Sequence, residues 1–191
     1  PYVDASCRRE PDLEHPHPAI TAICRGQNFA PRLREGDHVV YLTVLGSYPG
    51  YKERCWGFVA ALRVISIHSA HTDGAAWYAE RGFNLPNNCM VLGTTPTPLT
   101  QTGKLPPKIT SLRLWDATYR KRAREWPCLC VTEPLFVELN APAVVTRETL
   151  MDIFGRVPGT QTPPRILEGQ FDSLLEVGRN APHGRLGRPG P

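Results

Sequence analysis

The sequence predicts an α+β fold, in which a small, curved, mostly antiparallel β-barrel is flanked by helices and followed by a C-terminal helical extension. Hydrophobic residues make up 41% of the 191 residues, which is enough to bury a core. The 20 prolines and 16 glycines argue against an all-helical bundle. Two β-branched and aromatic runs, at 38–44 and 55–65, predict long strands, and an amphipathic segment at 165–177 predicts a late helix.

The barrel is predicted from the first third of the chain. A short strand is expected at 2–7, and a glycine-bearing turn at 33–37 leads into the run 38–44. A polar loop at 46–54 then joins this run to the strand 55–65, which makes an antiparallel pair with an exposed connection. Both faces of the second long strand are apolar, which favours curvature or closure into a barrel.

The rest of the chain alternates helices with short strands. Asp116 is the expected N-cap of a basic helix, and Gly155 is expected to end the helix that begins at Thr146. The predicted helices cover 69–83, 116–125, 146–155 and 165–177, the strands cover 90–92 and 129–139, and an extended proline-rich loop covers 94–108.

These elements predict three regions along the chain. Residues 1–140 are expected to form the barrel domain, and residues 141–179 a helical extension packed on it. The last residues, 180–191, are rich in glycine and proline and are expected to form a disordered tail.

The charge of the chain is mildly positive, with 22 Lys and Arg residues against 18 Asp and Glu residues. Only four of the basic residues are lysines, and the arginines that dominate carry a planar fork suited to phosphates and guanine edges. A GC-rich genome would produce the same bias, because its codons favour Arg, Pro, Gly and Ala. Both interpretations stay open.

Localisation and cofactors are predicted from what the sequence lacks. No apolar run approaches the roughly 18 residues of a membrane span, and no secretory leader is visible, so a cytoplasmic protein without a membrane partner is expected. The six cysteines are scattered and are expected to be reduced thiols. Their spacing does not pick out four convergent ligands, so we expect neither a metal nor a cofactor.

Four segments in a fixed order resemble a known superfamily. They are 2–8 (YVDASCR), 20–26 (ITAICRG), 36–41 (GDHVVY) and 58–64 (FVAALRV). Together they resemble the PUA-like superfamily, which includes the EVE, ASCH and YTH domains, and most of all its nucleotide-modification-associated domains. The resemblance spans roughly residues 2–92. It implies a closed barrel with a pocket for one extruded base, lined by residues that follow the first strand.

Such a pocket needs an aromatic face for stacking and fixed polar groups that read the edge of the base. Trp56 and Tyr48 are the expected stacking residues, with Tyr51, Trp77 and Tyr78 as further candidates. The expected edge-reading and lining residues are Asp4, Ser6, Cys7, Cys24, Arg25 and Asn88. Each has a structural alternative, since Trp56 could pack in the core, Asp4 could cap a turn and Asn88 could belong to one.

Contacts to a nucleic-acid backbone are expected from basic residues, which could equally form a solvated face. The predicted backbone-binding residues are Arg8, Arg32, Arg34, Arg120, Lys121, Arg122 and Arg124, and Arg9 and Arg25 are further candidates.

The predicted function is a reader module that recognises a modified, flipped-out base in DNA, or less readily RNA, in a base-modification or restriction system. One alternative is a hydrolase of ASCH-like type that uses Asp4, Ser6, Arg25 and His38. Another is a protein–protein scaffold that uses the C-terminal helices and the 94–107 loop. A homodimer through those helices is also considered.

Overall fold

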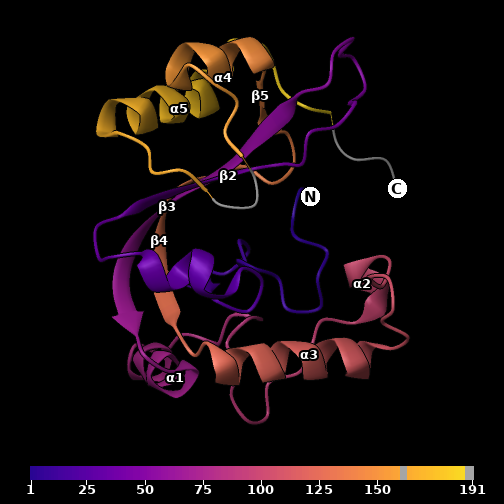
Figure 1. Ribbon diagram of the computed structural model, residues 1–191, viewed down its shortest axis with the longest axis vertical. Coiled ribbons are helices and arrows are strands. Elements are labelled where there is room, and N and C mark those ends of the chain that lie inside the picture. The colour runs from indigo at the N-terminus through magenta and orange to yellow at the C-terminus, as the bar shows by residue number, and fades with distance from the viewer. Residues whose placement is uncertain (160–162, 188–191) are drawn as a thin grey trace. The chain divides into compact units, whose positions relative to one another are not determined.

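The computed structural model describes residues 1–159 and 163–187, and it confirms the α+β class. Within the described residues the strands form a five-stranded antiparallel sheet, in which four follow the order β1-β4-β3-β2 and the fifth, β5, pairs with β3. The strands are β1 (Ala19–Thr21), β2 (His38–Leu42), β3 (Trp56–His68), β4 (Leu129–Val137) and β5 (Ala143–Val145) (Figure 1).

The described strands do not close into a barrel. The strands at the two ends of the sheet order, β1 and β2, are not paired with each other, so the sheet has open edges and the predicted barrel is not confirmed. The expected first strand at 2–7 is irregular backbone, and so is the expected strand at 90–92. In place of the first of these, β1 pairs with β4, with Ile20 opposite Cys130.

The α-helices of the described residues are α1 (His71–Glu80), α2 (Leu99–Thr102), α3 (Leu112–Glu125), α4 (Arg147–Phe154) and α5 (Glu168–Asn180). All but α2 lie close to predicted helices, whereas α2 falls within 94–108, which was expected to be an extended loop. The expected cap at Asp116 is wrong, because α3 begins one turn earlier, where the Ser111 side chain accepts the Leu114 N–H at 3.2 Å. The Thr146 cap and the left-handed Gly155 stop are confirmed.

The chain divides into two compact units, which differ from the predicted domains. Unit 1 comprises Pro1–Tyr2, His38–Leu62 and Pro134–Pro191, and unit 2 comprises Val3–Asp37 and Arg63–Glu133. Both β3 and β4 therefore contribute residues to both units. In unit 1, Trp56 and Phe58 of β3 pack with residues of α4 and α5, whereas in unit 2 Leu129 and Val131 of β4 pack with Tyr78 of α1.

The core of unit 1 lies between its strands and the last two helices. In Figure 1, α4 and α5 lie side by side next to β5. Trp56 and Phe58 from β3 pack with Phe171, Leu174 and other apolar residues of this cluster. The ring of His38 stacks on Phe171, with the two ring centres 4.2 Å apart.

Part of the predicted disordered tail also belongs to unit 1. Leu186 is 1% exposed and packs with Cys55 and Val144, and Arg185 forms a β-bridge with Ala143. The tail is therefore ordered as far as the structure describes it, because it buries one large apolar side chain. Residues 188–191 lie outside the described residues.

Apolar clusters of unit 2 bring its helices and loops together. The first combines Trp115, Tyr119 and Ala123 from α3 with Cys7 and Ile23. The second surrounds the wholly buried Tyr78 of α1 and includes Ala19, Cys89, Leu129 and Val131. Cys7 packs in the first cluster and Cys89 in the second, so these clusters anchor the irregular segments 3–18 and 83–98. Among the described helices, none has the length and apolar character to cross a bilayer.

Candidate binding site

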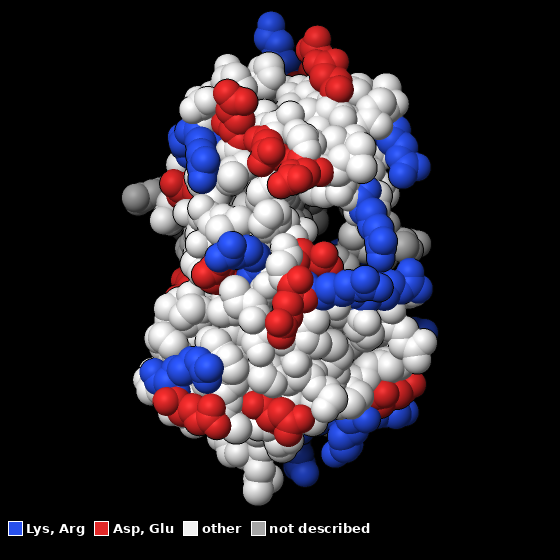
Figure 2. Space-filling model, turned by 90° about the vertical axis from the view of Figure 1, so that its left-hand side faces the viewer, with Lys and Arg blue, Asp and Glu red and all other residues white. Residues whose placement is uncertain are grey.

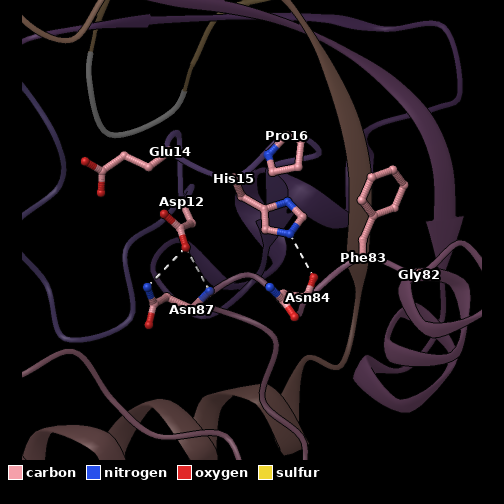
Figure 3. Close-up of a pocket in the computed structure, with 8 residues that line it drawn as sticks. All are labelled: Asp12, Glu14, His15, Pro16, Gly82, Phe83, Asn84 and Asn87. Carbon is pink, nitrogen blue, oxygen red and sulfur yellow. Dashed lines mark hydrogen bonds between the residues drawn. The ribbon is translucent and has the colours of Figure 1, made fainter.

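Unit 2 contains a cavity of about 460 Å³ between two irregular segments. One wall comes from the loop 12–16 and the other from the turn 82–87 that follows α1 (Figure 3). Its lining residues are Asp12, Glu14, His15, Pro16, Gly82, Phe83, Asn84 and Asn87. The volume is within the range of small-molecule sites in proteins.

Asp12 is the most deeply placed charged group of this cavity. The residue is 7% exposed, and its Oδ2 accepts hydrogen bonds from the backbone N–H and the side-chain amide of Asn87, at 3.0 and 3.1 Å. The carboxylate therefore ties the two walls together through Oδ2, and its second oxygen, Oδ1, is a further hydrogen-bond acceptor.

Two of the lining residues, His15 and Phe83, carry rings. Both ring nitrogens of His15 are engaged, because Nδ1 lies 2.9 Å from the backbone nitrogen of His17 and Nε2 lies 2.8 Å from the carbonyl oxygen of Asn84. The ring of Phe83 packs against His17 with the ring centres 4.6 Å apart. The side chains of His15 and Phe83 thus offer ring surface rather than proton-transfer groups.

A group of hydrogen bonds around Glu10 holds the first wall. The Glu10 carboxyl group accepts hydrogen bonds from the N–H and hydroxyl groups of Thr21, at 2.5 and 2.6 Å, and from the Asn88 side chain at 2.9 Å. Burial raises the pKa of Glu10 to about 8, although these hydrogen bonds act in the opposite direction. The backbone N–H of Glu10 donates to Asp4, which also accepts the Ser6 hydroxyl at 2.6 Å.

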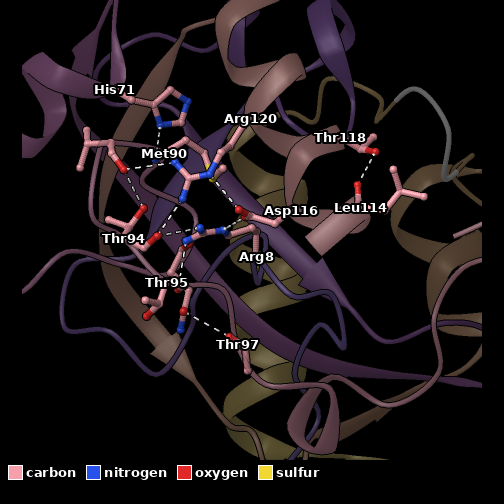
Figure 4. A network of polar contacts seen from close by, with 12 residues as sticks. Arg8, His71, Met90, Thr94, Thr95, Thr97, Leu114, Asp116, Thr118 and Arg120 are labelled. Atoms are coloured by element: carbon pink, nitrogen blue, oxygen red, sulfur yellow. Dashed lines mark hydrogen bonds and ion pairs between the residues drawn. The ribbon is translucent and has the colours of Figure 1, made fainter. Parts of the chain in front are cut away.

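A second network, centred on Arg8, holds the other wall (Figure 4). Arg8 is wholly buried, and its Nε lies 2.8 Å from Asp116 Oδ1. Its remaining donors reach the carbonyl groups of Asn87, Thr94 and Thr95 at 3.0 to 3.2 Å. Burial raises the pKa of Asp116, but the hydrogen bonds from Arg8 and Arg120 outweigh it, and the pKa lies below its ordinary value.

The predicted pocket residues fall in different units. Asp4, Ser6, Cys7, Cys24, Arg25 and Asn88 belong to unit 2, whereas Tyr48 and Trp56 belong to unit 1. Asp4 and Ser6 bond each other, as the alternative of a capped turn implies, and Asn88 donates to Glu10 and to the Ala19 carbonyl. These three residues support the cavity walls and do not line the cavity.

The other predicted pocket residues are buried in cores, half-buried or exposed. Trp56 is 8% exposed and packs in the core of unit 1, as its structural alternative implies. The hydroxyl of Tyr48 bonds Thr43 Oγ1 at 2.9 Å and the Val44 carbonyl at 2.8 Å. Cys7 is wholly buried, and burial raises the pKa of its thiol to about 11. Cys24 and Arg25 are exposed.

The prediction that Arg8 contacts a phosphate backbone is wrong, because its guanidinium is buried and each of its nitrogens donates a hydrogen bond within the protein. Arg120 and Arg122 are half-buried and donate to backbone carbonyls. Arg32, Arg34, Lys121 and Arg124 are exposed. On the face drawn in Figure 2, basic and acidic side chains are interspersed.

None of the eight lining residues was among the predicted pocket residues; those not foreseen include Asp12, His15, Phe83 and Asn84. The first two lie in the segment 10–18 (EPDLEHPHP), whose prolines indicate irregular structure but whose carboxylates and imidazoles are a signal of a polar site. Phe83 and Asn84 follow the glycine that ends α1, and nothing in the local sequence pairs them with the earlier loop.

A second cavity, of about 330 Å³, lies in unit 1 between α4 and α5. Ile153 and Val177 form its apolar part, and Asp152, Glu176 and Asn180 are among its polar lining residues. It lacks a phenyl or indole ring, so it offers less stacking surface than the cavity of unit 2. Among the described residues, no group of three or more His, Cys, Asp or Glu side chains could hold a metal ion.

Comparison with known proteins gives no family for this chain. No family model, no curated protein and no solved structure matches it.

Proposed function

We propose that the cavity of unit 2 binds one unstacked heterocyclic base, and that the chain acts as a reader of a modified base in DNA. The observation that supports this most directly is the combination of lining groups: two flat rings, His15 and Phe83, beside a carboxylate and side-chain amides within a volume of about 460 Å³. A base needs these same two kinds of contact, a face and an edge.

The energetics of base capture fit such a site. Stacking of a base on an aromatic side chain contributes about 1–3 kcal/mol, which is similar to the cost of unstacking the base from a helix. Edge contacts then decide which base is held. Asp12 Oδ1 can accept from an amino or imino group, and the exposed Asn84 amide can both donate and accept.

The backbone of the nucleic acid would stay outside the cavity. Asp12 and Glu14 repel phosphate, so only the base enters, while exposed basic residues of unit 2 such as Arg32, Arg34, Lys121 and Arg124 contact the backbone. Binding to duplexes should therefore weaken steeply with salt, whereas base preference should persist.

The function expected from the resemblance to nucleotide-modification-associated domains of the PUA-like superfamily is retained, but the base is now placed in the cavity of unit 2 rather than beside Trp56. In this proposal, Asp4, Ser6 and Asn88 position the loop that carries Asp12 and His15, and Trp56 serves the core of unit 1. The hydrolase alternative gains no support, because Asp4 and Ser6 bond each other and the ring of His38 stacks on Phe171.

The experiment is a binding panel of duplexes that carry different cytosine and adenine modifications, measured at two salt concentrations. The test variant is Asn84→Ala, whose side chain is exposed and holds no hydrogen bond among those described. Its matched control is Asn140→Ala, an exposed amide of unit 1. The proposal predicts that one modification binds more tightly than the plain duplex, that Asn84→Ala reduces this preference, and that Asn140→Ala does not. Equal binding of all duplexes by the unaltered protein would overturn it.

A further inference from the structure

The charged residues that line the cavity of unit 2 are both acidic. Asp12 and Glu14 each contribute a carboxylate, and the lining includes neither Lys nor Arg. Asp12 is more than nine-tenths buried, so the field of its charge is screened less than that of a surface carboxylate. A positively charged ligand would therefore bind this cavity more tightly than a neutral ligand of the same shape.

The nearby cations do not cancel this preference at the cavity itself. Arg8 is fully engaged by Asp116 and by backbone carbonyls, and its guanidinium is not among the lining groups. Arg9, whose side chain is 13% exposed, forms an ion pair with Glu14, whose side chain is 50% exposed. Solvent at the half-exposed Glu14 carboxylate screens this pair, so a bound cation can compete with Arg9 for Glu14.

The aromatic walls favour the same kind of ligand. The faces of aromatic rings are negative, and they attract a cation within about 6 Å of the ring centre. Phe83 supplies such a ring, and the His15 ring adds a second flat surface. A planar cation can stack on a ring and meet a carboxylate with its edge at the same time.

We propose that the base read by this cavity is a positively charged one, in which alkylation of a ring nitrogen has placed a delocalised charge on the heterocycle. This inference rests on the proposed function and names its substrate class. N7-alkylated guanine, N1-alkylated adenine and N3-alkylated cytosine belong to the class. A modification that leaves the base neutral, such as a methyl group on C5 of cytosine, gains nothing from the two carboxylates.

Free nucleosides test the preference for a charged base directly, because they carry no phosphate and contacts to the backbone cannot contribute to their binding. Calorimetric titrations would compare N7-methylguanosine with guanosine, N1-methyladenosine with adenosine, and 5-methylcytidine with cytidine. We expect about tenfold tighter binding of at least one cationic nucleoside than of its neutral parent, as a partly desolvated cation–π and carboxylate contact gives. We expect no difference for the 5-methylcytidine pair.

The variants assign the effect to the lining charges. Glu14→Gln removes the half-exposed carboxylate and leaves Arg9 without its partner, so the cationic preference should fall severalfold while neutral nucleosides bind as before. Glu125→Gln, an exposed carboxylate of the same unit that does not line the cavity, is the matched control and should change nothing. Phe83→Leu keeps an apolar side chain in the wall but removes the ring, so it should weaken the binding of all nucleosides.

The possible failures are distinguishable. If neutral and cationic nucleosides bind equally, or if Glu14→Gln leaves the ratio unchanged, the charge inference is wrong and the proposed base-binding function stands. If no nucleoside of either kind binds to the unaltered protein, both are overturned.

Discussion

Arg8 and Asp116 are separated by 108 positions in the sequence, yet their side chains form a direct ion pair with Nε and Oδ1 2.8 Å apart. The pair joins the irregular N-terminal segment to the first half of α3. Because Arg8 also donates to the Asn87 carbonyl, it fixes the turn that forms one wall of the cavity. The arrangement of this cavity therefore depends on a buried charge that does not line it.

Replacement of Arg8 should destabilise the protein strongly. Arg8→Met leaves the carbonyls of Asn87, Thr94 and Thr95 without their donors, and loss of one partner of a buried ion pair costs about 3–5 kcal/mol. Urea unfolding measures the loss. Arg113→Met, at an exposed position on α3, should change the free energy of unfolding by no more than about 0.5 kcal/mol. Equal effects of the two substitutions would show that the Arg8 network contributes little.

Glu10 should give the stability a distinctive pH dependence. Its pKa is raised from 4.5 to about 8 in the folded chain. Between these two values the folded protein holds a proton that the unfolded chain has released. The stabilisation is therefore complete below about pH 4.5 and is lost as the pH rises through about 8.

Glu10→Gln tests this prediction, because glutamine does not titrate. The free energy of unfolding of the variant, measured by urea titration from pH 4.5 to 9, should lack the decline of the unaltered protein. The variant can be less stable at low pH, since its amide cannot accept all three hydrogen bonds of the Glu10 side chain. The readout is the slope of the free energy of unfolding against pH. Parallel curves for the two proteins would show that Glu10 does not cause the pH dependence.

Two glycines of α5 should respond in opposite directions to the same substitution. A Cβ atom at Gly178 would lie 2.5 Å from the ring of Phe58, so Gly178→Ala should destabilise the protein by about 1–3 kcal/mol through overpacking. A Cβ atom at Gly169 would meet nothing within 4 Å, so Gly169→Ala should stabilise the helix by up to about 1 kcal/mol. Thermal unfolding compares them. A Gly178→Ala protein as stable as the Gly169→Ala protein would contradict this packing of α5 on β3.

Local patterns in the sequence were sufficient for most of the regular structure. The run 55–65 predicted β3, and the Thr146 and Gly155 signals predicted the two ends of α4. Such signals act within one turn or one strand, so the neighbouring residues contain the information. The cap at Asp116 failed for an instructive reason: this carboxylate bonds Arg8 and Arg120 rather than a helix N-terminus.

The candidate site could be predicted only in part. Asp4, Ser6 and Asn88 were recognised as polar residues of interest, and the structure brings them to one hydrogen-bonded group around Glu10. Their role is to support the walls, which depends on where their hydrogen bonds go. No pattern in the segment 10–18 reveals that Asp12 meets Asn87, because that pairing spans 75 positions.

The sequence by itself determined the α+β class, the long strand β3 and the principal helices, because hydrophobic periodicity and capping residues act over short distances along the chain. Only the tertiary structure decided that the sheet stays open, that Trp56 packs in a core, and that Asp12, His15 and Phe83 line one cavity. Those outcomes depend on which distant segments bury surface and exchange hydrogen bonds with each other, and partners so far apart in the chain leave no local pattern.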